Sequence, residues 1–334
     1  MDVDAFVAAH QDEWDRLDTL LRRGRSLTGA EADELVQLYQ RAATHLSTIR
    51  STTPDPALVG RLSSLVARAR ATVTGTRAPA WREAALFFTR RFPAAVYRTR
   101  YWWLSTAAVF VAVSTALGVW IARTPSVQGT IAAPDEIREL TRPGGLFESY
   151  YSNEPAGSFA AQVWTNNAWV AAGSLALGIL IVPVVYMLVQ NAVNVAIAGG
   201  LMAAAGRLDI FFGLITPHGL LELTAVFIAA GAGLRLGWTL IDPGRRRRAD
   251  ALAQEGRVAA GLALGLACVL LVSGAIEAFV TPSGLPTAGR VGVGLAAEAL
   301  FLAYIFGLGR RAALAGETGD VGEAALADTT PVAG

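Results

Sequence analysis

Runs of apolar residues dominate the chain from about residue 100 onward. A membrane-spanning helix takes about 20 mostly apolar residues, so each run of that length predicts one crossing of a bilayer. The runs are 102–122, 168–190, 218–241, 258–280 and 291–308. A further apolar segment, 192–206, would be only about 22 Å long as a helix, which is short of a bilayer core of about 30 Å.

The arginines give the direction of the crossings. They are concentrated before the first run, at 245–248 and at 310–311, and such clusters stay on the cytoplasmic side of a membrane. Both ends of the chain are then cytoplasmic, so the chain has to cross outward between Asn191 and Pro217. We therefore predict six crossings, the third of them short and completed by protein-buried, non-helical or interfacial backbone. A re-entrant loop there would leave five spans and would conflict with one arginine cluster.

The N-terminal part has a different pattern. Apolar side chains recur at helical spacing, with charged residues between them, which predicts a cytoplasmic helical region over residues 1–75. Thr28 and Glu31 form a capping box that opens the second helix, and 58–73 predicts a third. Three short helices bury little area alone, so we expect them to lean on the membrane part or on a partner.

Three further segments complete the expected organisation. Residues 76–101 mix aromatic side chains with arginine, which predicts an interfacial basic-aromatic helix kinked at Pro93; a plain basic flank of the first span is the alternative. The transmembrane domain covers 102–310 and includes an extracytoplasmic loop at 123–167, where we expect short amphipathic helices. Residues 311–334 are small and acidic, which predicts a disordered cytoplasmic tail.

The composition agrees with a membrane protein. Hydrophobic residues make up 53% of the chain and charged residues 16%, against about 25% charged in soluble domains. The net charge of +1 gives no reason to expect nucleic acid as a partner, and the single cysteine, Cys268, excludes an internal disulfide. We predict an all-α, polytopic protein of the bacterial cytoplasmic membrane with about six transmembrane helices.

The stretch with the most chemistry is TPHGLLELTAVFIAAGAGLRLG, residues 216–237. Thr216 can cap a helix and Pro217 suits its first position, so the stretch predicts the start of a span. His218 and Glu222 lie four residues apart and share a face. Small residues continue close to this face and allow another helix to approach, as helices packed in lipid require. These residues are Gly219, Ala225, Ala229, Gly233 and Gly237.

Polar residues in or beside the spans can converge into one intramembrane cluster. Such groups are expensive in lipid and face protein or water. They can hydrogen-bond between helices and fix the packing, line a conduit or substrate cavity, or bind a metal through His218, Glu222 and Glu277. The sequence favours packing, and we assign no catalytic residue, metal or cofactor, because it shows no phosphate loop, nucleophile elbow or second catalytic histidine. The candidates are His218, Glu222, Glu277, Asn166, Asn167, Asn191 and Glu298; His10 and His45 are expected to be partly buried side chains without chemistry.

Three separated segments form a recognisable set. They are Asn166-Asn167 with Val170 to Gly178 and Asn191, then HGLLEL from His218, then Ile276-Glu277-Ala278 with Thr281-Pro282. Together they resemble the NNxxVA…G…N, HGxxEL and IEA..TP segments of the stage II sporulation protein M-like membrane proteins, in that family's order and within residues 98–310. This chain departs from the family pattern at Asn191-Ala192, where the family often has Asn-Gly. The resemblance implies a membrane component of a complex that remodels the cell wall during sporulation.

Two functions follow as expectations. The first is a non-catalytic scaffold or accessory component of an envelope or cell-wall remodelling complex, with membrane or cell-wall proteins as partners beside the lipid bilayer. The alternative is a transporter or channel whose polar path is lined by His218, Glu222, Glu277 and Glu298. Recurring small-residue stripes also predict a homo-oligomer, preferably a dimer; a monomer that uses all stripes internally is the alternative.

Overall fold

The computed structural model describes residues 3–23, 27–52, 56–73, 80–150 and 156–321. These residues are mostly helical and contain no strand, which confirms the predicted all-α class. The chain divides into two compact units, Met1–Ala84 and Ala85–Gly334, called below the N-terminal unit and the membrane unit.

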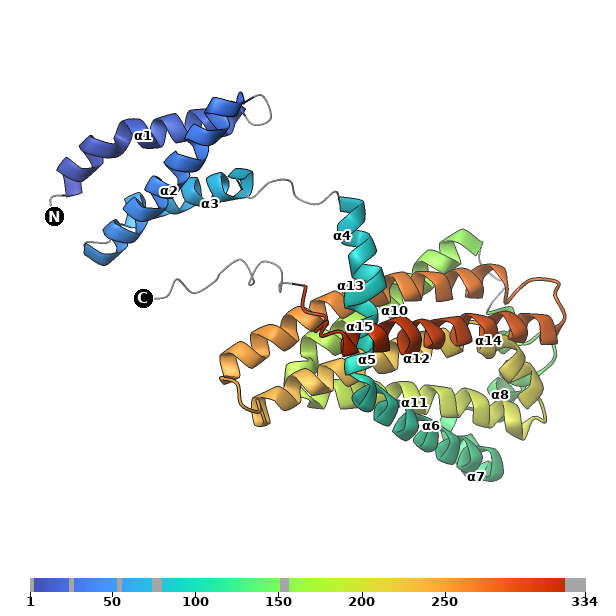
Figure 1. The fold of residues 1–334 in the computed structure, drawn as a ribbon. Helices are drawn as coiled ribbons and strands as arrows, with labels where there is room; N and C mark the ends of the chain where they lie inside the picture. The colour runs from blue at the N-terminus through green and yellow to red at the C-terminus, as the bar shows by residue number, and fades with distance from the viewer. Residues whose placement is uncertain (1–2, 24–26, 53–55, 74–79, 151–155, 322–334) are drawn as a thin grey trace. The chain divides into compact units, whose positions relative to one another are not determined.

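The N-terminal unit contains the helices α1 (Val3–Arg23), α2 (Gly29–Thr52) and α3 (Pro56–Val73) (Figure 1). The predicted capping box of α2 is confirmed, because the Thr28 N–H donates to Glu31 Oε2 at 2.9 Å and the Glu31 N–H donates to Thr28 Oγ1 at 3.4 Å. The apolar stripes of these helices meet in one core. Its fully buried side chains include Trp14, Leu17, Leu20, Ile49 and Leu62.

The membrane unit is built from long helices (Figure 1). Among the described residues, five helices are long and apolar enough to cross a membrane. They are α6 (Arg100–Arg123), α11 (Val182–Ala204), α12 (Leu208–Ile241), α13 (Arg248–Phe279) and α14 (Thr287–Tyr304), the last continued by a π turn (Ile305–Gly309) and α15 (Arg310–Leu314). A further helix, α10 (Ala156–Ala176), runs into a 3-10 turn (Leu177–Leu180) and supplies a shorter apolar segment. The predicted polytopic architecture with about six membrane helices is confirmed.

Contacts between helix ends show that the helices alternate in direction. At one end of the bundle, Arg98, just before α6, lies beside Arg235 near the end of α12, and Glu255 near the start of α13 pairs with the same arginine. At the other end, Gly199 near the end of α11 faces Phe211 at the start of α12. The end that holds Arg98 and Arg235 is called below the arginine-rich end.

The second and third crossings lie elsewhere than the sequence predicts. The predicted span 168–190 is broken at Ile181, which has a φ of 58°. Pro183 lies in the first turn of α11 and does not kink a span, because a residue without an N–H costs nothing there and would cost a hydrogen bond in mid-helix. Since α11 is helical throughout, the prediction of a short third crossing completed by non-helical backbone was wrong.

α12 begins earlier than predicted, at Leu208 and not at Thr216. Pro217 therefore lies inside the helix and not at its first position. Gly294 of α14 packs against this point, since a Cβ added to it would meet the Pro217 backbone. Proline is tolerated inside membrane helices where a neighbouring helix covers the altered backbone.

The segment before α6 consists of α4 (Ala80–Leu86), a π turn (Phe87–Arg91) and α5 (Phe92–Arg98). Because Pro93 has no N–H, the helix widens just before it, and the Phe92 N–H bonds to Phe87 O. Phe92 and Val96 are buried, and the Phe92 ring lies against Gly265 of α13. In α5, the apolar face of the predicted interfacial helix therefore packs against the helical bundle.

The loop and the tail differ from the prediction in extent. The loop contains the short helices α7 (Pro125–Ile131), α8 (Pro134–Thr141) and α9 (Leu146–Ser149), but α10 begins within the predicted loop, so Asn167 is helical. The tail is ordered over residues 311–321, because Asp320 is buried and its carboxylate pairs with Arg257 Nη2 at 2.7 Å. The rest of the predicted tail, 322–334, lies outside the described residues.

Candidate functional site

His218 is buried on the face of α12 that meets α13. Its Nδ1 lies 3.3 Å from Thr281 Oγ1, and its Nε2 lies 3.7 Å from Glu277 Oε1. The Ser273 hydroxyl donates to the His218 carbonyl oxygen at 2.9 Å. Side chains of α13 and of the turn after it therefore hold both the ring and the backbone of this histidine.

Glu222 follows His218 by one turn and joins the same group. It accepts a hydrogen bond from the Asn167 side chain of α10. His218, Glu222 and Glu277 each offer one ligand-type atom, and these three atoms lie within 4.8 Å of one another. Tyr150, which follows α9, is close by: burial raises the pKa of its hydroxyl, and the Glu277 and Glu222 carboxylates raise this pKa further. We call His218, Glu222, Glu277, Asn167 and Thr281 the His218 cluster.

Two other predicted members, Glu298 and Asn191, are not brought into this cluster. Glu298 of α14 accepts a hydrogen bond from Thr224 Oγ1 at 2.9 Å. Thr224 is two positions after Glu222, about 200° around the helix, and so lies on another face of α12. Asn191 lies in the middle of α11 and donates to a carbonyl of its own helix at 2.9 Å. The side chain of Asn166 lies outside the described residues.

The small residues near the end of α12 lie against α10 and the turn after it. A Cβ added to Gly233 would meet the Ser174 carbonyl and the Gly178 backbone, and one added to Gly237 would meet the Gly178 carbonyl. Gly219 differs, because a Cβ there would meet a side chain of its own helix. The other predicted packing residues, Ala225 and Ala229, are fully buried.

A pocket of about 410 Å³ borders the His218 cluster at the end of the bundle that holds the α13–α14 turn. Thr281 lines it, and so does Arg290, whose Nη1 donates to the Thr281 carbonyl oxygen at 2.8 Å. In the sequence, Thr281 stands out only as part of a family-like segment, and Tyr150 and Ser273 do not stand out as site residues. Their only signal is a polar side chain in or beside an apolar segment, which spacing alone does not connect to His218.

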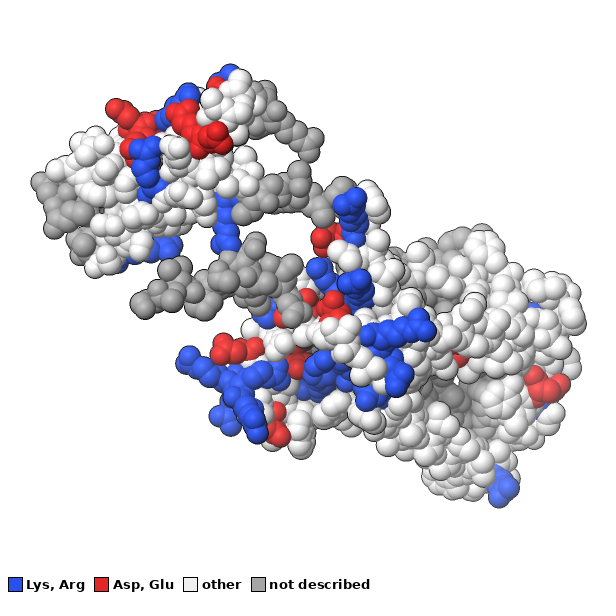
Figure 2. Space-filling model, in the orientation of Figure 1, with Lys and Arg blue, Asp and Glu red and all other residues white. Residues whose placement is uncertain are grey.

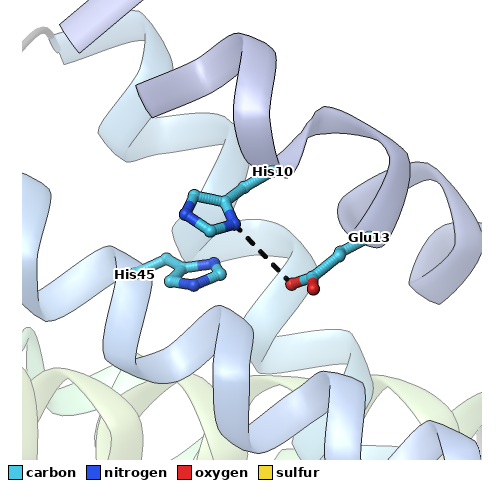
Figure 3. Close-up of side chains that lie close together, drawn as sticks. All are labelled: His10, Glu13 and His45. Carbon is cyan, nitrogen blue, oxygen red and sulfur yellow. Dashed lines mark ion pairs between the residues drawn. The ribbon is translucent and has the colours of Figure 1, made fainter. Parts of the chain in front are cut away.

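The N-terminal unit holds a second group of this kind, in which His10 and Glu13 of α1 face His45 of α2 (Figure 3). The two imidazole rings lie 4.0 Å apart, and His10 Nδ1 lies 3.9 Å from Glu13 Oε2. The buried Trp14 donates its Nε1–H to His45 Nδ1 at 3.2 Å. A neutral His45 that accepts this bond carries its hydrogen on Nε2, so neither of its nitrogens has a free lone pair for a metal. This geometry favours the predicted structural role of the two histidines.

We expect the N-terminal unit to lose stability as the pH falls below about 6.5, the ordinary pKa of histidine. Burial lowers the pKa of His45, and the neighbouring His10 lowers it further; Glu13 raises this pKa and Arg41 lowers it. The folded unit therefore favours the neutral ring, so its stability is complete above this pH and is lost as the ring becomes protonated. Hydrogen exchange of α1 and α2 in the intact protein, at about pH 5.5 and 7.5 and corrected for intrinsic rates, measures the loss. The variant His45→Gln should lose this pH dependence, and an unchanged dependence would contradict the assignment.

Comparison with known proteins identifies two regions. Residues 4–75, in the N-terminal unit, match a domain of unknown function, DUF8413. No curated protein and no solved structure matches the chain. Residues 107–282 match the family model described as Stage II sporulation protein M, and this match includes the His218 cluster and covers more than half of the chain. The protein therefore belongs to the stage II sporulation protein M family of membrane proteins.

Proposed function

We propose that this protein is a non-catalytic scaffold or accessory component of a complex that remodels the bacterial cell envelope. It acts from the cytoplasmic membrane as a multi-pass protein with both ends in the cytoplasm. Membership in the family supports a membrane role; the scaffold role is our inference from the way the helices are joined.

The observation that carries the proposal is that polar side chains join one helix to another. α12 is bonded to α13 through His218, to α10 through Glu222 and to α14 through Thr224. In addition, Trp164 Nε1 of α10 donates to the Ala267 carbonyl of α13 at 2.9 Å. Interhelical hydrogen bonds fix the packing of helices in lipid. A bundle fastened at these places is suited to hold partner proteins in constant positions.

The transporter alternative is less well supported by the geometry. It requires His218, Glu222, Glu277 and Glu298 to line one path. Glu298 bonds to Thr224, on a face of α12 different from the one that carries Glu222. The four side chains are therefore divided between two sides of the central helix.

Photo-crosslinking in cells tests the scaffold role. A photoreactive residue is placed at Leu300 of α14 or at Val109 of α6, which are 72% and 64% exposed on the surface of the membrane unit, and at the fully buried Ile228 as a control. We expect adducts with specific envelope proteins from the exposed positions and none from the control. Adducts with lipid and the same chain alone would contradict the proposal. A conductance in planar bilayers that disappears in Glu298→Gln would favour transport.

Reporter fusions test the proposed topology. Figure 2 shows arginine side chains gathered over one part of the membrane unit, while the far part of this unit is mostly uncharged. Arg245–Arg248 are exposed, and Arg246 lies beside Glu255 at the arginine-rich end. Because such clusters stay in the cytoplasm, reporters fused after Arg248 and after Arg311 should read cytoplasmic, and one near Glu148 should read external. An external reading after Arg248 would reverse the direction of α12.

We also propose that the protein forms a homo-oligomer, with a two-fold dimer preferred because this symmetry is the commonest. The helix α6 supports this, because it leaves much of its apolar surface uncovered, including Val111 and Trp120. Native mass measurement in mild detergents and in nanodiscs should give a mass of two chains. A single-chain particle under all conditions would contradict the dimer, and this apolar face of α6 would then be covered by lipid.

A further inference from the structure

Glu277 is a buried carboxylate in an unusual position. Its side chain is 5% exposed, and its Oε2 has no hydrogen-bond partner among the described residues. Burying an ionised carboxylate is costly unless it is paired or coordinates a metal. A second carboxylate, Glu222, lies in the same cluster, and no arginine of the described residues forms an ion pair with either of them. Such a buried pair of carboxylates either takes up protons or is neutralised by a bound cation, which would bring up to two positive charges.

The distance between His218 and Glu277 points to what supplies this charge. Nε2 and Oε1 are 3.7 Å apart, which is longer than a normal hydrogen bond of about 2.7–3.2 Å. Two ligands bound at about 2.1 Å to one tetrahedral zinc ion lie about 3.4 Å apart. The two side chains thus stand near the separation of two ligands of a shared ion.

Neighbouring residues orient two of the three ligands, His218 and Glu222. With a hydrogen on Nδ1 donated to Thr281 Oγ1, which is 3.3 Å away, His218 presents the lone pair of Nε2 toward Glu277. Asn167 holds the Glu222 carboxylate by a hydrogen bond. Partners of this kind set the tautomer and the angle of ligands in metal sites. His45 differs, because its partner Trp14 donates to the ring and leaves it no free lone pair.

We propose that His218, Glu222 and Glu277 bind one divalent transition-metal ion of the zinc class, through Nε2 and one oxygen of each carboxylate. Imidazole nitrogen and carboxylate oxygen are both ligand types of zinc, and three protein ligands leave the fourth tetrahedral position open. The ion neutralises both carboxylates and ties α12 to α13, with α10 attached through Asn167. The pocket lined by Thr281 borders the site. This inference is independent of the scaffold role, which crosslinking tests separately.

The chain has three histidines, so two substitutions leave His218 as the sole possible imidazole ligand. In an untagged full-length protein carrying His10→Gln and His45→Gln, His218 is the only imidazole. This protein is purified in nanodiscs, stripped with a chelator, incubated with ZnCl₂ and washed, and its zinc content is measured by mass spectrometry. X-ray absorption then counts the imidazoles around the zinc. We expect about one zinc per chain, with one imidazole and oxygen ligands at about 2.0–2.2 Å.

Matched variants in the same background locate the ion. Glu277→Gln should lower zinc affinity at least tenfold, whereas Glu298→Gln changes a partly buried carboxylate outside the cluster and should leave the affinity unchanged. Equal zinc uptake by the two variants would overturn the proposal. If a glutamate variant fails to fold, the double histidine variant alone still tests the proposal. Failure of this protein to take up zinc, or zinc bound without an imidazole ligand, would also overturn the proposal.

Discussion

Replacing Gly233 with leucine is expected to prevent the membrane unit from assembling, and replacing it with alanine to destabilise the fold by about 1–3 kcal/mol. A Cβ at this position would lie 3.2 Å from the Ser174 carbonyl carbon and 3.3 Å from Gly178 Cα, and closer still to the Ser174 carbonyl oxygen. These are backbone atoms, which cannot rotate away as the end of a side chain can. α10 and α12 would have to move apart, and the interhelical contacts around Glu222 would weaken with them. Thermal unfolding in mild detergent measures the loss.

A matched substitution separates this contact from the general effect of changing a helical glycine. Gly292 of α14 has nothing within 4 Å of an added Cβ. Gly292→Ala should leave stability unchanged or raise it by about 0.5–1 kcal/mol, because alanine favours the helix over glycine. Wild-type unfolding of Gly233→Leu would show that α10 and α12 do not meet at this glycine.

The presence of a further helix before the His218 helix could be predicted from arginine, but the exact bounds of the crossings could not. The arginine clusters predict an additional crossing there, and the structure has a long apolar helix at this place, α11. Hydropathy alone does not mark Ile181 as a break, because an isoleucine with positive φ is rare and its neighbours are as apolar as any span. Pro183 was the available signal: it fits the first turn of a helix as well as a kink. The choice depends on packing between distant segments, here Gly178 against Gly233.

The candidate site could be predicted from the sequence only in part. The spacing of His218 and Glu222 put them on one face of a helix, but it could not say which residues of other helices meet that face. In the structure Glu222 accepts a hydrogen bond from Asn167, while His218 faces Glu277 and Thr281. Glu298 is grouped with them in the sequence because it is a carboxylate within a predicted span, and this does not show which side of α12 it meets.

Arg235 shows the same limit at the arginine-rich end, and it provides the second prediction with a large expected effect. The sequence does not show which residue Arg235 meets; in the structure its Nη2 lies 2.8 Å from Oε1 of Glu255, on α13. The Glu255 side chain is 7% exposed and also lies 3.5 Å from Arg246. Removing one partner of a buried ion pair costs about 3–5 kcal/mol. Because Arg235 is 26% exposed and keeps some access to water, we expect about 2–3 kcal/mol for Glu255→Ala.

A double-mutant cycle distinguishes this pairing from a loss of packing. The cost of Glu255→Ala arises from leaving Arg235 without its partner, so Arg235→Leu combined with Glu255→Leu should lose clearly less stability than the two single substitutions added together. Glu139→Ala serves as the control, because Glu139 and Arg142 form an exposed pair on α8 and in the turn after it, with 47% and 53% of their side chains exposed, and exposed pairs contribute little. Its melting temperature should remain that of the wild type. Additive losses in the cycle would mean that Arg235 and Glu255 do not stabilise the turn between α12 and α13 as a pair.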